Sequence, residues 1–220
     1  MKQENYWKKL SLSLFLIGGV VIGCKEQSSG PLPILGPYKV QDNIVDGVLK
    51  TDTNFTTVRP FSFVDQDGNE VSHATLEGKI YVTDFFFTSC PTICPKMKQQ
   101  MLRLYDDFEG NNDVLFLSHS IDPKRDSVTR LHDYAEKLGI SSARWHLMTG
   151  DRDSIYSMAK HYMIAAQEDK LAPGGYAHSG AFLLVDRNKQ IRGIYDGTDA
   201  EDVDKLAHDI NGLLNDEIHP

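Results

Sequence analysis

The feature that most constrains the fold is an almost continuous run of apolar and β-branched residues from Ile80 to Phe87. A strand with one face in water alternates apolar and polar residues, whereas a continuous run is typical of a strand buried on both faces. The chain of 220 residues is long enough for one domain of ordinary size and too short for two large ones. The run therefore predicts the central strand of a sheet inside a single core.

Helices and strands alternate along the rest of the chain. Apolar residues recur at helical spacing over 95–108, 126–138, 154–162 and 200–214. Further strands are predicted at 114–121, 144–148, 181–185 and 190–195, and a short hairpin with a glycine turn at 60–72. This order predicts an α/β fold class, a thioredoxin-like sheet flanked by helices with an N-terminal hairpin, over residues 56–216.

The first 23 residues have the pattern of a signal segment. Three lysines precede an apolar run over 10–23, which is too short to span a bilayer as a signal anchor would. The run ends in Val-Ile-Gly-Cys, which resembles a bacterial lipobox, and charged residues follow at once. We therefore expect residues 1–23 to be a lipoprotein signal peptide, with Cys24 lipidated as the mature N-terminus.

The charge of the chain bears on its partners. Removal of residues 1–23 takes away three lysines and one glutamate, which changes the net charge from −8 to −10. Such an acidic body argues against nucleic-acid binding and would be repelled by an anionic membrane, so the anchor has to be lipid. Residues 24–55 are expected to be the lipidated N-terminus and linker, with a Ser, Gly and Pro-rich spacer over 25–40. The predicted location is extracytoplasmic, on the periplasmic side of a bacterial membrane.

Two cysteines are placed where reactive chemistry is expected. Cys90 and Cys94 lie in the sequence Cys-Pro-Thr-Ile-Cys-Pro, between the buried strand and the first long helix. A helix N-terminus stabilises a thiolate, and Pro95 suits the first helical turn. Three interpretations compete: a structural disulfide, a redox dithiol and a metal site. The structural disulfide is the weakest, because a domain with an ample core has little need of such a short loop closure.

A third ligand would favour the metal site, and His178 is the candidate among eight histidines. It lies in a loop with three glycines that leads directly into the predicted strand at 181–185. In a thioredoxin-like sheet the start of that strand lies beside the redox loop, so His178 can approach both sulfurs. Two thiolates and one imidazole suit copper, whereas zinc usually takes a fourth ligand.

Three blocks of the sequence resemble the Sco/SenC family of copper-binding thioredoxin-fold proteins. They are residues 78–95 with the cysteine motif, residues 120–127 with Ser-Ile-Asp-Pro-Lys-Arg-Asp-Ser, and His178-Ser179 before the strand at 182–186. The similarity covers roughly residues 60–214, with the blocks in family order. It implies that Cys90, Cys94 and His178 bind copper, and that the protein supplies copper to, or reduces cysteines of, the dinuclear copper site of cytochrome c oxidase.

The sequence departs from this family at two positions. Family members often carry Asp where this chain has Thr92 and Ala177. The loss of nearby acids is expected to weaken Cu(II) binding or alter partner choice without removing a proposed ligand.

Two other acidic positions need an interpretation. Asp84 lies within the buried strand, where an acid must be partnered or shifted in pKa, and it is a candidate for moving protons beneath the thiols. The segment from Asp122 to Asp126 opens as an Asp-Pro turn, and Asp126 is expected to cap the following helix. No catalytic residue is assigned.

The alternative function is a thiol-disulfide reductase that acts on an extracytoplasmic partner. A cysteine pair that holds Cu(I) can also cycle through a redox-active disulfide, Cys90–Cys94, and would then need an external thiol reductant. A thioredoxin-type enzyme normally has two residues between its cysteines, and this chain has three. The Thr-x-x-Cys pattern of peroxiredoxins is absent at both cysteines, which argues against a peroxidase.

Overall fold

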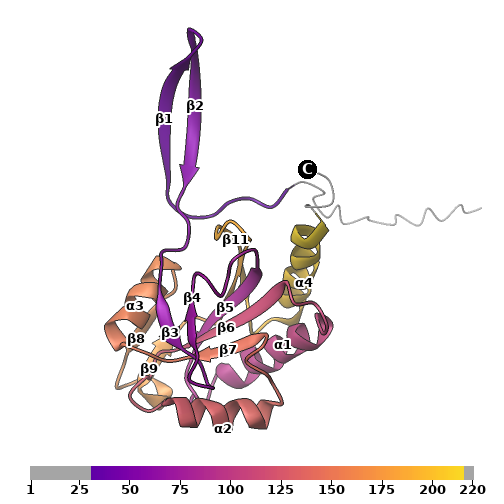
Figure 1. The fold of residues 1–220 in the computed structure, drawn as a ribbon. Helices are drawn as coiled ribbons and strands as arrows, with labels where there is room; N and C mark the ends of the chain where they lie inside the picture. The colour runs from indigo at the N-terminus through magenta and orange to yellow at the C-terminus, as the bar shows by residue number, and fades with distance from the viewer. Residues whose placement is uncertain (1–30, 216–220) are drawn as a thin grey trace, which may run out of the picture. The chain divides into compact units, whose positions relative to one another are not determined.

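The computed structural model describes residues 31–215, with a five-stranded sheet at the centre. The strand order is β11-β10-β5-β6-β7; β5, β6 and β7 are parallel to one another, whereas β10 is antiparallel to β5 and to β11. The strands are β5 (Ile80–Phe86), β6 (Val114–Ser120), β7 (Trp145–Met148), β10 (Ala181–Val185) and β11 (Ile191–Asp196). This mixed sheet with helices around it is the predicted thioredoxin-like architecture (Figure 1).

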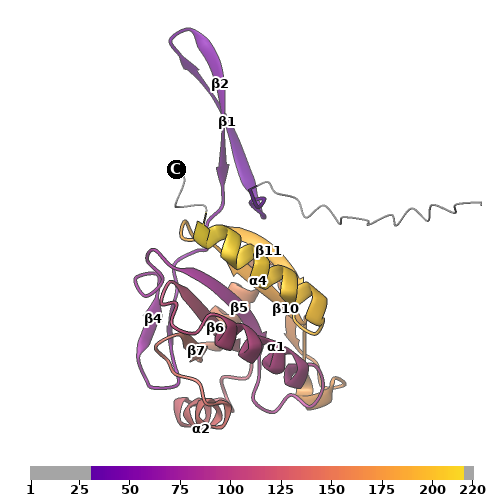
Figure 2. The ribbon, with the colours of Figure 1, turned by 90° about the vertical axis from the view of Figure 1, so that its right-hand side faces the viewer.

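Helices cover both faces of the sheet. They are α1 (Cys94–Asp107), α2 (Val128–Leu138), α3 (Arg152–His161) and α4 (Ala200–Asn215). Helices α1 and α4 lie side by side over one face (Figure 2), where Arg103 pairs with Asp204. Helix α3 packs on the opposite face together with the short hairpin of β3 (Ser62–Val64) and β4 (Glu70–Ser72), which is the hairpin predicted at 60–72.

The central strand β5 explains why both faces are covered. All of its residues are buried, and their side chains alternate between two cores. Ile80, Val82 and Phe86 pack with α1 and α4, whereas Tyr81 and Phe85 pack with α3 and the β3–β4 hairpin. Each large apolar side chain buried in this way contributes about 1.5–3 kcal/mol. The continuous apolar run was therefore a correct guide to a doubly covered strand.

Helix α2 shows how local chemistry sets its ends. Ser127 is the N-cap, and its side chain accepts a hydrogen bond from the backbone N–H of Arg130. Gly139 closes the helix in the left-handed conformation, at φ 70°, as predicted. The expectation that Asp126 caps α2 is wrong. Its carboxylate is fully buried and accepts hydrogen bonds from Thr88 and Ser120 instead.

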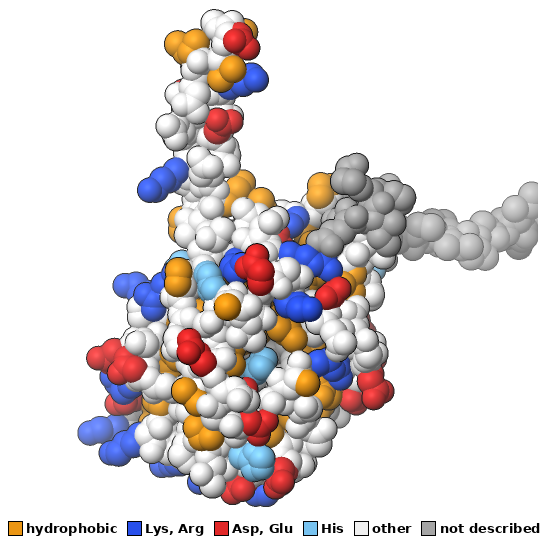
Figure 3. Space-filling model, viewed as in Figure 1, with side chains coloured by type: hydrophobic (Ala, Val, Ile, Leu, Met, Phe, Trp, Pro, Cys, Tyr) orange, Lys and Arg blue, Asp and Glu red, His pale blue; other side chains and the backbone are white. Residues whose placement is uncertain are grey.

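A second hairpin occupies residues that the sequence analysis assigned to the linker. Strands β1 (Tyr38–Val45) and β2 (Val48–Phe55) pair in antiparallel register around a turn with Asp46 at φ 55° and Gly47 at φ 78°. Most of its side chains are exposed, including apolar ones near the tip such as Ile44, which is 76% exposed (Figure 3). A semi-extended spacer was expected as far as residue 40, but the chain already forms a strand at residue 38.

The predicted signal segment 1–23 and the proposed lipidation site Cys24 lie outside the described residues. Within residues 31–215, no helix is both long enough and apolar enough to cross a membrane.

Candidate metal centre

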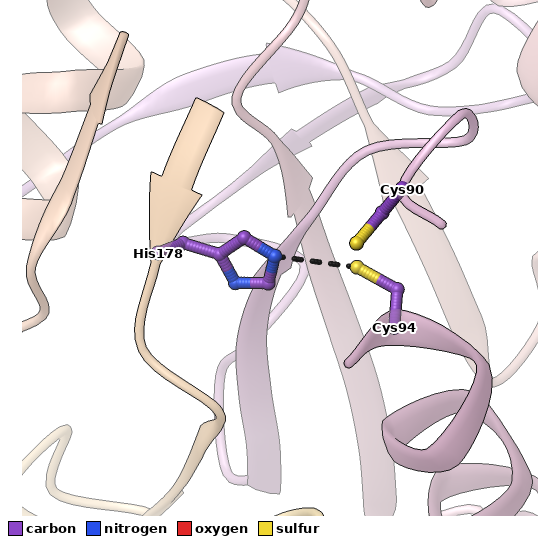
Figure 4. Close-up of side chains that lie close together, drawn as sticks. All are labelled: Cys90, Cys94 and His178. Atoms are coloured by element: carbon purple, nitrogen blue, oxygen red, sulfur yellow. Dashed lines mark hydrogen bonds between the residues drawn. The ribbon is translucent and has the colours of Figure 1, made fainter. Parts of the chain in front are cut away.

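Cys90, Cys94 and His178 come together in the structure (Figure 4). The two sulfurs and one ring nitrogen all lie within 4.8 Å of one another. Each side chain comes from a different part of the fold: the loop after β5, the first residue of α1, and the short strand β9 (Tyr176–His178). The predicted approach of the histidine to both sulfurs is therefore found in the geometry.

The two cysteines differ in their surroundings. Cys94 is 5% exposed and belongs to the core beneath α1, whereas Cys90 is partly exposed. Both are free thiols. Pro95 stands in the first turn of α1, as predicted, where a missing N–H removes no helical hydrogen bond. The Cys90 sulfur also lies 3.7 Å from the hydroxyl of Thr92.

His178 is presented by a strand rather than by the predicted loop. Strand β9 pairs with β8 (Ala166–Glu168) in a small sheet separate from the central one, after a short 3-10 turn over Pro173–Gly175. The Nδ1 atom lies 3.0 Å from the carbonyl of Ser179, to which it donates when it carries the ring proton. In that tautomer Nε2 presents its lone pair toward the Cys94 sulfur, 3.3 Å away. The carbonyl thus orients the ring, as partners of metal-binding histidines commonly do.

The electrostatics make the two sulfurs unequal. Burial opposes ionisation of Cys90, but hydrogen bonds from the Cys94 thiol and from the backbone N–H groups of Thr92 and Cys94 outweigh it and lower the Cys90 pKa. Burial raises the pKa of Cys94, and its hydrogen bond to Cys90 acts in the same direction. Burial also lowers the pKa of His178, which keeps its ring neutral and able to act as a ligand.

The donor set limits which metals the site suits. Two thiolates are soft ligands, and imidazole adds a nitrogen, so the set fits Cu(I) in trigonal coordination and Cu(II) with an additional oxygen. Within the described part of the chain, no carboxylate joins this group of three ligand atoms. A structural zinc site would usually have a fourth protein ligand, so the set favours copper over zinc.

Asp84 lies close to this centre but is not part of it. It is fully buried on β5, and burial raises its pKa to about 7. Among the described residues its Oδ1 has no hydrogen-bond partner, and the carboxyl lines a cavity of about 20 Å³ together with Cys94 and Ser118. That volume is large enough for about one water molecule. The sequence-based expectation of a shifted acid beneath the thiols therefore agrees with the structure, and its role in proton transfer stays a prediction.

The side chains that hold the cysteine loop were not predicted from the sequence. Thr88 and Ser89, just before Cys90, hydrogen-bond to Asp126 and Arg125 of the segment after β6. Tyr176 on β9 was also overlooked, although its place two residues before His178 puts it on the same side of the strand. That spacing was the one signal in the sequence that pointed to it.

Comparison with known proteins identifies the family. The SCO1/SenC family model matches residues 50–215, so the chain belongs to the SCO1/SenC family. A curated relative, the SCO1 protein homolog of Bacillus subtilis, is 31% identical over 74% of this chain and 84% of its own length.

Solved structures show the same fold. A SCO1/SenC family lipoprotein from Bacillus anthracis aligns with a TM-score of 0.65 and 29% identity, over 72% of this chain and 95% of that one. Copper-bound ScoI from Arabidopsis thaliana aligns with a TM-score of 0.61 and 26% identity, over 73% of this chain and 99% of that chain. BsSco, a member of the Sco family of cytochrome c oxidase assembly proteins in which a disulfide switch was identified, aligns with a TM-score of 0.59 and 29% identity, over 71% and 92%.

Proposed function

We propose that this protein is a membrane-anchored copper chaperone that binds one copper ion through Cys90, Cys94 and His178. The copper that it carries is used to assemble the dinuclear copper site of cytochrome c oxidase. The protein that receives the copper is the copper-site subunit of that enzyme. The observation that carries the proposal is the convergence of two sulfurs and one imidazole nitrogen within 4.8 Å. Copper bound to the related Arabidopsis ScoI supports the choice of metal.

The anchor is proposed to be a lipid on Cys24, on the periplasmic side of the membrane. The lipobox-like sequence before Cys24 supports it, as does the related Bacillus anthracis lipoprotein. Cys24→Ser is expected to yield an unprocessed precursor or a released extracytoplasmic protein, with copper binding by the isolated domain unchanged. Mass spectrometry of the membrane fraction tests this, and an unmodified Cys24 within an intact signal segment would contradict it.

Copper binding by reduced protein tests the ligands. Wild type should take up one copper per chain, measured anaerobically by metal analysis and competition with a Cu(I) chelator. Cys90→Ser and Cys94→Ser should each abolish tight binding, because a hydroxyl does not replace a soft sulfur ligand. His178→Ala should weaken Cu(II) more than Cu(I), because Cu(I) can remain on two thiolates.

A matched control is His132→Ala, since His132 is an exposed histidine on α2 away from the three ligands. It should bind copper as wild type does. Unchanged stoichiometry and affinity in both cysteine variants would refute the site.

A second candidate function is a thiol-disulfide reductase, favoured by the partly exposed Cys90 beside the buried Cys94. The Cys90 thiolate would attack a partner disulfide and release one partner thiol. Cys94 would then attack the mixed disulfide, release the second thiol and leave a Cys90–Cys94 disulfide, which an extracytoplasmic dithiol reductant must reduce. A Cys94→Ser variant that accumulates a mixed disulfide with a model substrate would support this function, and failure to trap one would count against it.

A further inference from the structure

Asp122 links the histidine strand to the rest of the site. It lies two residues after the end of β6 and is 3% exposed. Its Oδ1 accepts a hydrogen bond of 2.8 Å from the hydroxyl of Tyr176 on β9. Tyr176 and His178 point to the same side of that strand, since they are two residues apart. Both rings pack on Phe87, at centroid distances of 5.2 and 5.8 Å.

The same carboxylate also faces the cysteine loop. Its Oδ2 lies 3.5 Å from Nε of Arg125, and Nη1 of Arg125 donates a 2.8 Å hydrogen bond to the hydroxyl of Ser89. Ser89 is the neighbour of Cys90 in the chain. A single buried carboxylate thus contacts side chains that lead to two of the three proposed ligands.

Asp126 holds the cysteine loop through a second set of hydrogen bonds. Its carboxylate accepts hydrogen bonds from the backbone N–H of Thr88 at 3.0 Å, from the Thr88 hydroxyl at 2.5 Å and from Ser120 at 2.6 Å. Its own backbone N–H donates to the carbonyl of Asp122 at 2.9 Å. The two acids therefore belong to one hydrogen-bonded turn, and the loop before Cys90 is held firmly to it.

The histidine strand, by contrast, has little support of its own. It contains three residues, pairs only with β8 in the described structure, and follows Gly174 and Gly175, both at positive φ. A Cβ on Gly174 would lie 2.7 Å from the Phe87 ring, so the backbone there passes directly over that side chain. Such a strand depends on side-chain contacts for its position relative to the cysteines. Packing on Phe87 is one such contact, and the Tyr176–Asp122 hydrogen bond adds a directional one.

We infer that Asp122 is a positioning residue that, through Tyr176, holds the imidazole of His178 in register with the thiols of Cys90 and Cys94. This inference rests on the proposed copper-binding function and deepens it. It assigns the acid of the Asp-Pro turn a role in how well the site accepts Cu(II), because the histidine is the ligand that Cu(II) needs and Cu(I) can do without.

The test is Tyr176→Phe, which removes the hydroxyl and keeps the ring on Phe87. Cu(II) affinity should fall on the order of tenfold, the low end of what outer-shell changes cost a metal site. Cu(I) affinity should stay within about twofold, because the two thiolates are untouched. Electron paramagnetic resonance of the Cu(II) form should show weakened nitrogen hyperfine coupling.

Tyr156→Phe is the matched control. The Tyr156 hydroxyl donates to the carbonyl of Ile121 at 2.9 Å, next to Asp122, but Tyr156 belongs to α3 and not to the histidine strand. This variant should bind Cu(I) and Cu(II) with the affinities of wild type. Asp122→Asn keeps an oxygen that can accept from Tyr176 and should stay close to wild type in Cu(II) affinity, whereas Asp122→Ala should match Tyr176→Phe.

A copper-independent measurement separates this inference from the proposed function. In metal-free reduced protein, Tyr176→Phe should increase amide hydrogen exchange at residues 176–179, and Tyr156→Phe should not. Unchanged exchange and unchanged Cu(II) affinity in Tyr176→Phe would overturn the inference, as would equal effects of the two tyrosine variants. Failure of the proposed function would appear differently, as wild-type copper binding by Cys90→Ser.

Discussion

At the scale of single residues, the buried side chains of His119 and Asp84 make stability depend on pH in opposite directions. His119 is fully buried on β6, and neither ring nitrogen has a hydrogen-bond partner in the described structure. Its ring is stacked on Phe85 at 4.8 Å and lies edge-on to Phe63 at 5.4 Å. Burial lowers its pKa to about 3, so the native protein keeps it neutral.

The first prediction is that His119→Phe reduces sensitivity to acid. The unfolded chain binds a proton at this histidine below about pH 6.5, and the native state does not, so stability is lost as pH falls from there toward 3. Phenylalanine removes that loss. In urea unfolding, the difference in free energy of unfolding between the variant and wild type should be about 2 kcal/mol larger, in favour of the variant, at pH 5 than at pH 8.

His132→Gln serves as a control with the opposite sign. A hydrogen bond to Asp67 raises the pKa of His132, so its contribution is present at low pH and fades as pH rises. The stability of this variant relative to wild type should therefore be lower at pH 5 than at pH 8. A pH-independent gain from His119→Phe would show that His119 is not kept neutral.

The second prediction concerns Asp84, whose pKa is raised to about 7 by burial. The native state holds the proton more tightly than the unfolded chain, so stability is full below pH 4 and declines as pH rises through 7. Asp84→Asn stays neutral, so its stability relative to wild type should rise from pH 4 to about 7 and level off above that, as measured by thermal unfolding of reduced, metal-free protein. Asp107→Asn, an exposed change on α1, should show no such trend. A parallel decline in wild type and Asp84→Asn would contradict the assignment.

At the scale of elements, the two hairpins have different relations to the core. The β3–β4 hairpin buries Phe63 and Val71 against the sheet. The β1–β2 hairpin leaves most of its side chains exposed, among them Val40 and Leu49. A two-stranded hairpin without a packing partner contributes little to the stability of a domain.

The third prediction is that replacing residues 39–54 by a short Gly-Ser linker leaves the thermal midpoint within about 2 °C of wild type, because almost no buried surface is lost. The hydrogen bond from Leu35 to Ile191 remains in this variant. Phe63→Ala in the other hairpin is the comparison and should cost about 3–5 kcal/mol. A large loss of stability on removing the β1–β2 hairpin would show that it packs against the core.

At the scale of the whole molecule, the proposed copper site is expected to couple copper loading to the redox state of the cysteine pair. Thiolate is the ligand form, so a Cys90–Cys94 disulfide should not hold copper as the dithiol does. The histidine reaches the site from a separate small sheet, after a turn with two glycines at positive φ. Metal binding should therefore order that segment together with the cysteine loop.

The fourth prediction is that Cu(I) lowers hydrogen exchange in residues 171–180 of the reduced protein and leaves the oxidised protein unchanged. Copper should also raise the thermal midpoint of the reduced form only, since a ligand stabilises the state that binds it. Equal copper affinity of the oxidised and reduced forms would show that the dithiol and histidine mechanism is wrong, and would favour a structural disulfide.

Much of the fold was predictable from local patterns. The continuous apolar run marks β5 because a strand covered on both faces has no solvent side. The start of α1 follows from Pro95 and the end of α2 from Gly139. The β1–β2 hairpin could also have been predicted from the sequence, since Asp46-Gly47 is a strong turn signal. The Ser, Gly and Pro-rich residues before it favour an extended linker, which is why the sequence did not predict the hairpin.

By itself the sequence indicated the elements of the central sheet and its four helices, the cysteine pair at a strand-to-helix junction, and His178 as the candidate third ligand, because the strand, helix and loop signals that carry these predictions lie in short stretches of the chain. Only the tertiary structure decided which sulfur is buried, that Asp126 binds Thr88 instead of capping α2, and that Tyr176 meets Asp122. The physical reason is distance along the chain. His178 and Cys94 are separated by 84 residues, and the environment of each is set by side chains that only the packing of the sheet and helices brings together.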